Sequence, residues 1–151
     1  MLQDRKGPIH VVHECPSRPT IIFLTICTRG RDPWLDSPLV HDAFKEVSAD
    51  RSVYIVGKYV IMPEHVHLFV SPASRGSSPL SRWVGYWKSQ MTRRIVAHGT
   101  GWQPEYWDWT LRSTENYARK WEYVEKNPER RGLVMSACEW PYMGEIYQLK
   151  W

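Results

Sequence analysis

Two histidines separated by one hydrophobic residue, His65-Val66-His67, are the sharpest candidates for chemistry in this 151-residue chain. Side chains two positions apart on a β-strand point to the same face, so both imidazoles could bind one cation. The ordinary alternative is a pair of exposed strand histidines without a ligand, because short motifs often arise by chance. The motif therefore suggests a metal site without establishing one.

Two imidazoles do not complete the coordination of a divalent cation, and an oxygen ligand from elsewhere would suit Mg²⁺ or Mn²⁺. Tyr123 and Asn127 lie four residues apart in a segment with helical periodicity, which places them on one helical face. The amide oxygen of Asn127 could then bind the cation while the phenol of Tyr123 points at a substrate. Equally, Tyr123 could be a packing residue and Asn127 the end of a helix before Pro128.

The strands that would position these residues follow from the hydrophobic pattern. The apolar, β-branched run from Thr20 to Thr28 predicts a buried strand. Val53 to Met62 and His65 to Val70 predict a hairpin, with the break between them at Pro63-Glu64. Trp107 to Leu111 predicts a further strand.

Three helices are expected between and after these strands. Apolar residues recur at helical spacing from Pro38 to Asp50 and from Leu80 to about His98. Ser113 is the expected N-cap of a third helix that runs to about Asn127 and stops at Pro128. The order predicts an α/β (α+β) fold of ferredoxin-like, RRM-like type: an antiparallel sheet with helices on one face, plus the C-terminal helix that carries Tyr123.

Composition indicates one globular domain over residues 1–151, with residues 1–19 as an irregular arm. Hydrophobic residues make up 42% and charged residues 24%, which argues against disorder. No apolar run approaches the roughly 20 residues needed to span a membrane, and the first residues lack a signal-peptide pattern. Three cysteines without a C-x-x-C pair suggest reduced thiols. We therefore expect a cytoplasmic protein with no membrane partner.

Basic and aromatic residues are mixed in the second half of the chain. The net charge is +4, which is compatible with a polyanionic partner. Nine tryptophans and eight tyrosines are unusual in so short a chain, and several lie among the basic residues, including Trp83, Trp87, Trp107 and Trp109. This mixture is typical of base-stacking platforms, although a solvated helix face and an aromatic core would give the same composition.

Two longer segments resemble a known family. The segments YVIMPEHVHLFV (residues 59–70) and YVEKNPERRGLV (residues 123–134) look like the two signatures of single-tyrosine, IS200-like transposases of the histidine-hydrophobe-histidine superfamily. The resemblance is strongest to the REP-associated tyrosine transposases and spans about residues 20 to 142. Two signatures in the expected order are more specific than either alone.

The resemblance implies a metal-dependent enzyme that cleaves and rejoins single-stranded DNA at hairpins, such as REP-like palindromes. Tyr123 would be the nucleophile that forms a 5′-phosphotyrosine link, and His65, His67 and Asn127 would hold Mg²⁺ or Mn²⁺. Members of this family are often homodimers, and a DNA substrate implies association with the nucleoid. The expected DNA-binding residues are Arg82, Lys88, Arg93, Arg94 and Arg112.

One stretch departs from the family pattern, and a second tyrosine competes with Tyr123 for the role of nucleophile. The sequence WDWTLR (residues 107–112) stands where relatives usually show Tyr/Phe-Asp-His/Arg, so the resemblance implies no role beyond structure for this stretch, apart from the DNA contact expected of Arg112. Tyr117, six residues before Tyr123, lies on a different helical face and is the weaker candidate for the nucleophile.

Two other functions compete with the transposase hypothesis. A DNA-binding regulator of the same fold would bind hairpins without cleaving them. An unrelated metal hydrolase would use His65 and His67 on small phosphoesters, but the sequence offers no further cluster of metal ligands to favour it.

Overall fold

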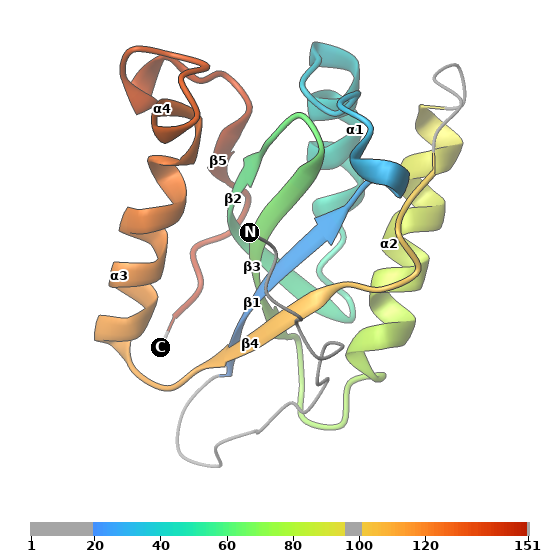
Figure 1. The fold of residues 1–151 in the computed structure, drawn as a ribbon. Coiled ribbons are helices and arrows are strands. Elements are labelled where there is room, and N and C mark those ends of the chain that lie inside the picture. The colour runs from blue at the N-terminus through green and yellow to red at the C-terminus, as the bar shows by residue number, and fades with distance from the viewer. Residues whose placement is uncertain (1–19, 96–100, 151) are drawn as a thin grey trace.

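A five-stranded antiparallel sheet lies at the centre of the computed structural model, which describes residues 20–95 and 101–150 (Figure 1). The strand order is β4-β1-β3-β2-β5. This arrangement confirms the antiparallel ferredoxin-like sheet predicted from the sequence. The strands are β1 (Ile21–Cys27), β2 (Tyr54–Ile61), β3 (His65–Pro72), β4 (Trp107–Leu111) and β5 (Met143–Glu145).

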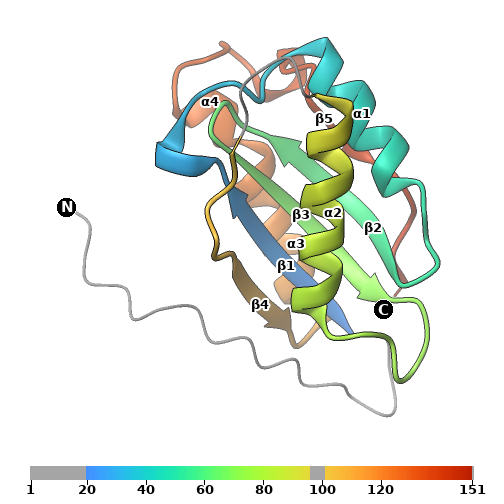
Figure 2. The same ribbon diagram turned by 90° about the vertical axis from the view of Figure 1, so that its right-hand side faces the viewer.

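Helices cover both faces of this sheet. Figures 1 and 2 show α1 (Pro38–Ser48) and α2 (Leu80–Arg94) on one face and α3 (Thr114–Glu125) on the other. Side-chain alternation along β3 separates the two cores, because Val66 and Leu68 pack with α1 and α2 while Phe69 packs with α3. The predicted two-helix layer is confirmed, and the C-terminal helix lies on the opposite face.

A serine side chain caps the start of each of two helices. The Ser37 hydroxyl accepts a hydrogen bond from the Val40 backbone N–H (3.2 Å), with Pro38 in the first turn of α1. The Ser113 hydroxyl accepts from the Asn116 backbone N–H (3.1 Å), which confirms its predicted role at the start of α3. The expected irregular arm (residues 1–19) lies outside the described residues. The helix predicted from Leu80 to about His98 ends earlier, at Arg94, and Ile95 already has a non-helical backbone.

The predicted end of the third helix was wrong. α3 ends at Glu125, and a separate helix, α4 (Asn127–Arg130), follows it. Pro128 lies in the first turn of α4, where the N–H that proline lacks would have no helical partner, so it starts a helix instead of stopping one. Tyr123 and Asn127 therefore belong to different helices, and their four-residue spacing no longer proves a shared face.

Several short elements had no signal in the sequence. β5 pairs with β2 over three residues, too few to show an alternating pattern. Among the described residues, the 3-10 helices η1 (Arg29–Arg31) and η3 (Ala137–Glu139) lie in connecting segments. Within the described ranges, every helix is too short or too polar to cross a bilayer.

Candidate active site

His65 and His67 lie at the start of β3 on the sheet face that α3 covers. In the register of β1 and β3, His67 is opposite Thr25 and His65 is opposite Cys27. His65 is only 7% exposed, and His67 is partly buried. The pair is therefore covered by protein, unlike the exposed strand histidines of the ordinary alternative.

The two imidazoles face each other through their Nε2 atoms, which are 3.0 Å apart. The opposite ring nitrogens are both engaged: His65 Nδ1 lies 3.0 Å from Glu64 Oε1, and His67 Nδ1 lies 2.9 Å from Thr25 Oγ1. A carboxylate can only accept, so His65 carries its proton on Nδ1 and accepts on Nε2, where His67 Nε2–H donates, and the Thr25 hydroxyl donates to His67 Nδ1. If the proton of His67 moves to Nδ1, with Thr25 then accepting, both Nε2 atoms are free to face one cation, as in sites where outer partners orient metal-binding histidines.

Glu64 connects the histidine pair to the segment that follows the tyrosine helix. Its side chain is 9% exposed, accepts a hydrogen bond from Arg131 Nη1, and lies 3.6 Å from Arg31 Nη2. Burial alone would raise the pKa of Glu64, but the Arg131 hydrogen bond and the charges of His65, Arg131 and Arg31 outweigh it and lower the pKa. The ionised carboxylate thus holds His65 and links β3 to Arg131, which directly follows α4.

Burial keeps both histidines neutral at physiological pH. It lowers the pKa of His65 to about 4, with Glu64 opposing the shift and Arg31 and Arg131 adding to it. Burial also lowers the pKa of His67 well below its usual range, and the charge of His65 and nearby basic side chains lower it further. The neutral imidazole is the form that binds metal, so the donor set suits a first-row divalent cation such as Mn²⁺.

These shifts predict that the metal-free protein loses stability in mild acid. The unfolded chain binds a proton at each histidine near the ordinary pKa of 6.5, whereas folded His65 does so near 4. The unfolded state therefore binds more protons between these values, so stability is full above about pH 6.5 and falls towards pH 4. Urea unfolding in EDTA at pH 7 and pH 4.5 should differ by more than about 1 kcal/mol.

The matched variant for this comparison replaces both histidines, His65→Phe with His67→Phe. Its stability should depend less on pH over the same interval, because the two buried histidines are gone while the other titratable groups are kept. An equal fall in both proteins would assign the effect to those other groups.

Tyr123 lies on the exposed flank of α3, with 61% of its surface accessible. The Arg130 guanidinium stacks 3.8 Å from the centre of the Tyr123 ring, and Arg130 Nη1 donates to the Tyr123 carbonyl (2.6 Å). Arg130 Nη2 also donates to Asn127 Oδ1 (3.3 Å). Arg130 thus ties together the predicted nucleophile and the predicted third ligand across the break between α3 and α4.

Lys120 and Phe23 connect Tyr123 to the histidine pair. The Lys120 ammonium lies 4.6 Å from the centre of the Phe23 ring and 5.9 Å from that of Tyr123. The Phe23 ring in turn stacks on His67, with centroids 5.2 Å apart and an interplanar angle of 26°. In the described part of the chain, neither Tyr123 nor Asn127 hydrogen-bonds to a histidine, and their roles as nucleophile and ligand remain predictions.

Tyr117 lies in a different environment from Tyr123. Its ring packs edge-on against Phe69, and its buried hydroxyl has no hydrogen-bond partner among the described residues. Burial raises the pKa of Tyr117 to about 12, with a smaller contribution from Glu145. A buried, less acidic phenol is poorly suited to attack a phosphodiester.

The five predicted DNA-binding residues do not gather around Tyr123. Arg82 and Arg93 are exposed on α2, on the face opposite α3. On the same helix, Arg94 pairs with Glu46 (3.4 Å), and the half-buried Lys88 donates to the Gln103 carbonyl (2.8 Å). Arg112 is also exposed but lies away from α2, at the corner between β4 and α3.

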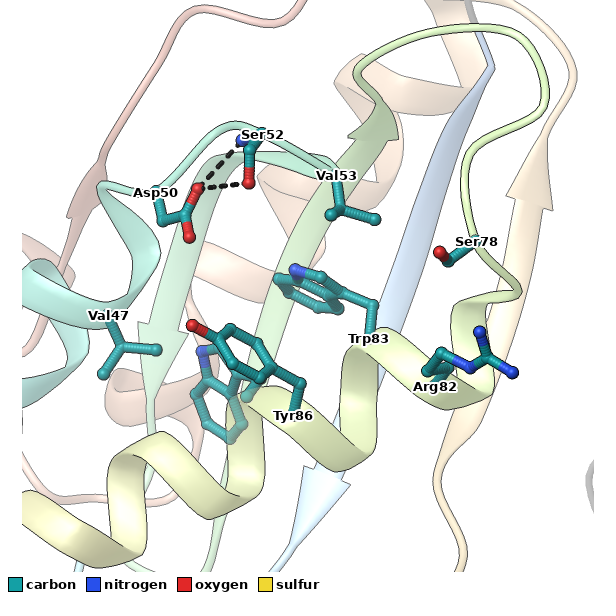
Figure 3. A pocket seen from close by; sticks show the side chains of 9 residues that line it. Val47, Asp50, Ser52, Val53, Ser78, Arg82, Trp83 and Tyr86 are labelled. Atoms are coloured by element: carbon teal, nitrogen blue, oxygen red, sulfur yellow. Dashed lines mark hydrogen bonds between the residues drawn. The ribbon is translucent and has the colours of Figure 1, made fainter.

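A cavity of about 240 Å³ lies beside α2, also across the sheet from the histidines (Figure 3). Trp83 and Trp87, which line its inner wall, are buried core residues. Tyr86 is exposed at the same cavity, and Asp50 and Arg82 lie at opposite ends of it in Figure 3. The buried tryptophans of α2 are therefore unavailable as stacking platforms.

Sequence reasoning missed the residues that support the site. Glu64 and Thr25 fix the histidine rings, and Lys120 and Arg130 flank the tyrosine. Only Lys120 had an available signal, because it lies three residues before Tyr123 and shares its helical face. Glu64 is adjacent to His65, and Arg130 lies three residues after Asn127, but nothing in their types showed these contacts; Thr25 contacts His67 from 42 residues away.

The contacts of Glu64 predict a defined effect of Glu64→Gln. Glutamine can still accept from His65, but the charge that stabilises the Nδ1–H tautomer and pairs with Arg131 is lost. Partners of this kind typically contribute about 10- to 100-fold to metal affinity. Mn²⁺ titration of the metal-free variant by calorimetry should show weakening in this range. Glu46→Gln, which removes an exposed ion pair with Arg94, is the control; unchanged Mn²⁺ affinity in Glu64→Gln would refute the role of Glu64.

Comparisons with known proteins identify the family of this chain. The family model described as "Transposase IS200 like" matches residues 9–127. A REP-associated tyrosine transposase of Escherichia coli (strain K12) is 28% identical over 127 residues, which cover 80% of this chain and 73% of the relative. A solved structure of a REP-associated tyrosine transposase bound to a REP hairpin superposes with a TM-score of 0.68 at 23% identity, covering 99% of this chain and 95% of that one. The resemblance seen in the sequence is confirmed, and the chain belongs to the IS200-like transposase family.

Proposed function

We propose that this chain is a metal-dependent enzyme that cleaves and rejoins single-stranded DNA at hairpins through a covalent bond to Tyr123. One observation carries the proposal: the His65 and His67 Nε2 atoms converge at 3.0 Å on the sheet face covered by the helix of the exposed Tyr123. Family membership supports DNA strand cleavage. A similar fold bound to a REP hairpin supports hairpin DNA as the substrate class.

Three side chains would hold the cation, Mg²⁺ or Mn²⁺. His65 and His67 would supply imidazole nitrogens, and Asn127 would supply its amide oxygen after releasing the hydrogen bond from Arg130. When bound, the cation would polarise a phosphate oxygen and stabilise negative charge on the leaving oxygen. Asp, Glu, His and Cys side chains form no group of three that could hold a metal in residues 20–95 and 101–150, so an amide ligand is the best available third donor.

The chemical steps proposed for the chain's own residues balance without ATP. The Tyr123 hydroxyl oxygen forms a bond to phosphorus, and the bond from phosphorus to the 3′ oxygen breaks. The phenol proton passes to solvent, and the 3′ oxygen takes up a proton to leave as a free 3′-OH. Another 3′-OH can then attack the 5′-phosphotyrosine, which rebuilds a phosphodiester and returns the proton to Tyr123.

Positive charge surrounds the proposed nucleophile. Arg130 stacks on one face of the Tyr123 ring, and the Lys120 ammonium lies 5.9 Å from its centre. Both cations attract the anionic phosphodiester towards the phenol oxygen, which is accessible because the side chain is exposed. The arrangement therefore favours binding of a phosphate beside Tyr123.

The test is a search for protein-linked DNA. Purified protein is incubated with labelled hairpin DNA that has single-stranded flanks, with Mg²⁺, Mn²⁺ or EDTA, and the products are separated on a denaturing gel. A covalent adduct that requires the cation is the expected result. Tight binding without an adduct in either metal would favour the DNA-binding regulator, and turnover of small phosphoesters without an adduct would favour the hydrolase.

A further inference from the structure

Trp109 is an exposed tryptophan on the same sheet face as the histidine pair. It lies in the middle of the edge strand β4 and is 67% exposed. The strand register places Trp109 opposite Phe23, the residue whose ring stacks on His67. Cross-strand partners share a face of the sheet, so Trp109 projects towards the side of β4 occupied by Phe23 and α3.

The exposed indole of Trp109 contrasts with the buried tryptophans of the core. Trp83, Trp87, Trp102 and Trp140 are buried, whereas no ring or cation from the described residues packs on Trp109. A structural role would bury this large apolar surface, since burial is what makes a tryptophan stabilising. The expectation that residues 107–112 serve structure alone therefore does not account for Trp109.

The surroundings of Trp109 favour a nucleic-acid ligand. The Lys120 ammonium lies 4.6 Å from the ring centre of Phe23, the cross-strand partner of Trp109. The neighbouring carboxylate, Asp108, belongs to the other face, because its partner on β1 is the core residue Leu24. An exposed aromatic ring, with a cation over its cross-strand neighbour and the nearest acid on the other face, suits a base and its phosphate.

We propose that Trp109 stacks on one unpaired base of the DNA near the phosphodiester that Tyr123 attacks, and so fixes the position of the strand. The proposal rests on the proposed function and names a base-binding subsite for it. Trp109 is one strand away from Phe23, within a few residues of the histidine pair. Stacking tolerates every base type, so this subsite positions the strand without selecting its sequence.

The test compares binding of one DNA by matched variants, all with Tyr123→Phe to prevent cleavage. Fluorescence anisotropy at fixed salt gives the Kd for a hairpin with single-stranded flanks. Trp109→Thr keeps a residue that suits an edge strand but removes the ring, and should weaken binding about tenfold. Trp109→Phe should stay within about threefold of the parent. Tyr86→Ala, which removes a 51% exposed aromatic across the sheet, should have no effect.

An abasic scan of the flanks identifies the base. At one position, removal of the base should weaken binding to the parent about tenfold and leave binding to Trp109→Thr unchanged, since the stacking partner is already gone. Equal losses in both proteins at every position would overturn the proposal. An unchanged Kd in Trp109→Thr would also overturn the proposal. In that case, adducts formed by the wild type would still support the proposed function. Absence of all hairpin binding would overturn both.

Discussion

Replacing Tyr123 by phenylalanine should abolish the protein-linked DNA fragment, with a loss of about a thousandfold or more in its rate of formation. The substitution removes one oxygen atom and keeps the ring on which Arg130 stacks. Because 61% of the side chain is exposed, no buried contact of the hydroxyl is lost. Hairpin binding, measured in parallel by anisotropy, should therefore remain within about threefold of wild type.

Tyr117→Phe is the matched control for this prediction. It makes the same chemical change on the same helix, at a hydroxyl that is buried and has no hydrogen-bond partner among the described residues. Removing such a hydroxyl should leave adduct formation intact and should not destabilise the fold. An adduct that persists in Tyr123→Phe but disappears in Tyr117→Phe would reverse the assignment of the nucleophile.

The histidine strand was predictable because its pattern is local. Alternation along residues 65–70 assigns Val66, Leu68 and Val70 to one face and the two histidines to the other, and the structure has this arrangement. The start of α3 at Ser113 was equally local, since the cap and its N–H partner are three residues apart. These signals need no knowledge of the rest of the chain.

The supporting contacts were not predictable because they join distant segments. Glu64 and Arg131 are separated by 67 residues, and Thr25 and His67 by 42. Which face α3 would cover was also undetermined, because strands β1 and β3 are apolar on both sides and can accept a helix on either.

Proline position explains the error at the end of the tyrosine helix. A proline after a helical run can end that helix or open the next one, and the sequence does not distinguish the two cases. Here it opens α4, and the resulting break at Lys126 separates Tyr123 from Asn127. Arg130, which hydrogen-bonds to both residues, restores a connection that the continuous helix was expected to provide.

Removal of one imidazole should abolish both cation binding and DNA cleavage. In His67→Ala, a single Nε2 remains where two now converge at 3.0 Å. We expect the Mn²⁺ affinity of the metal-free protein to fall at least about a hundredfold, beyond the typical effect of losing an outer partner. Adduct formation should fall below detection, because the phosphate would lose the cation that stabilises the leaving oxygen. Calorimetric Mn²⁺ titration and the denaturing gel measure the two effects separately.

His41→Ala separates loss of the site from general damage. His41 is a partly buried histidine whose Nε2 lies 2.7 Å from the Tyr59 hydroxyl, on the α1 side of the sheet. Its loss should destabilise the fold without changing Mn²⁺ affinity or adduct formation. His67→Phe covers the case in which alanine disturbs the Phe23 stack, since it retains an aromatic ring without a ligand atom. If His67→Phe folds and still forms metal-dependent adducts at the wild-type rate, the histidine pair does not hold the catalytic cation, and another ligand set must.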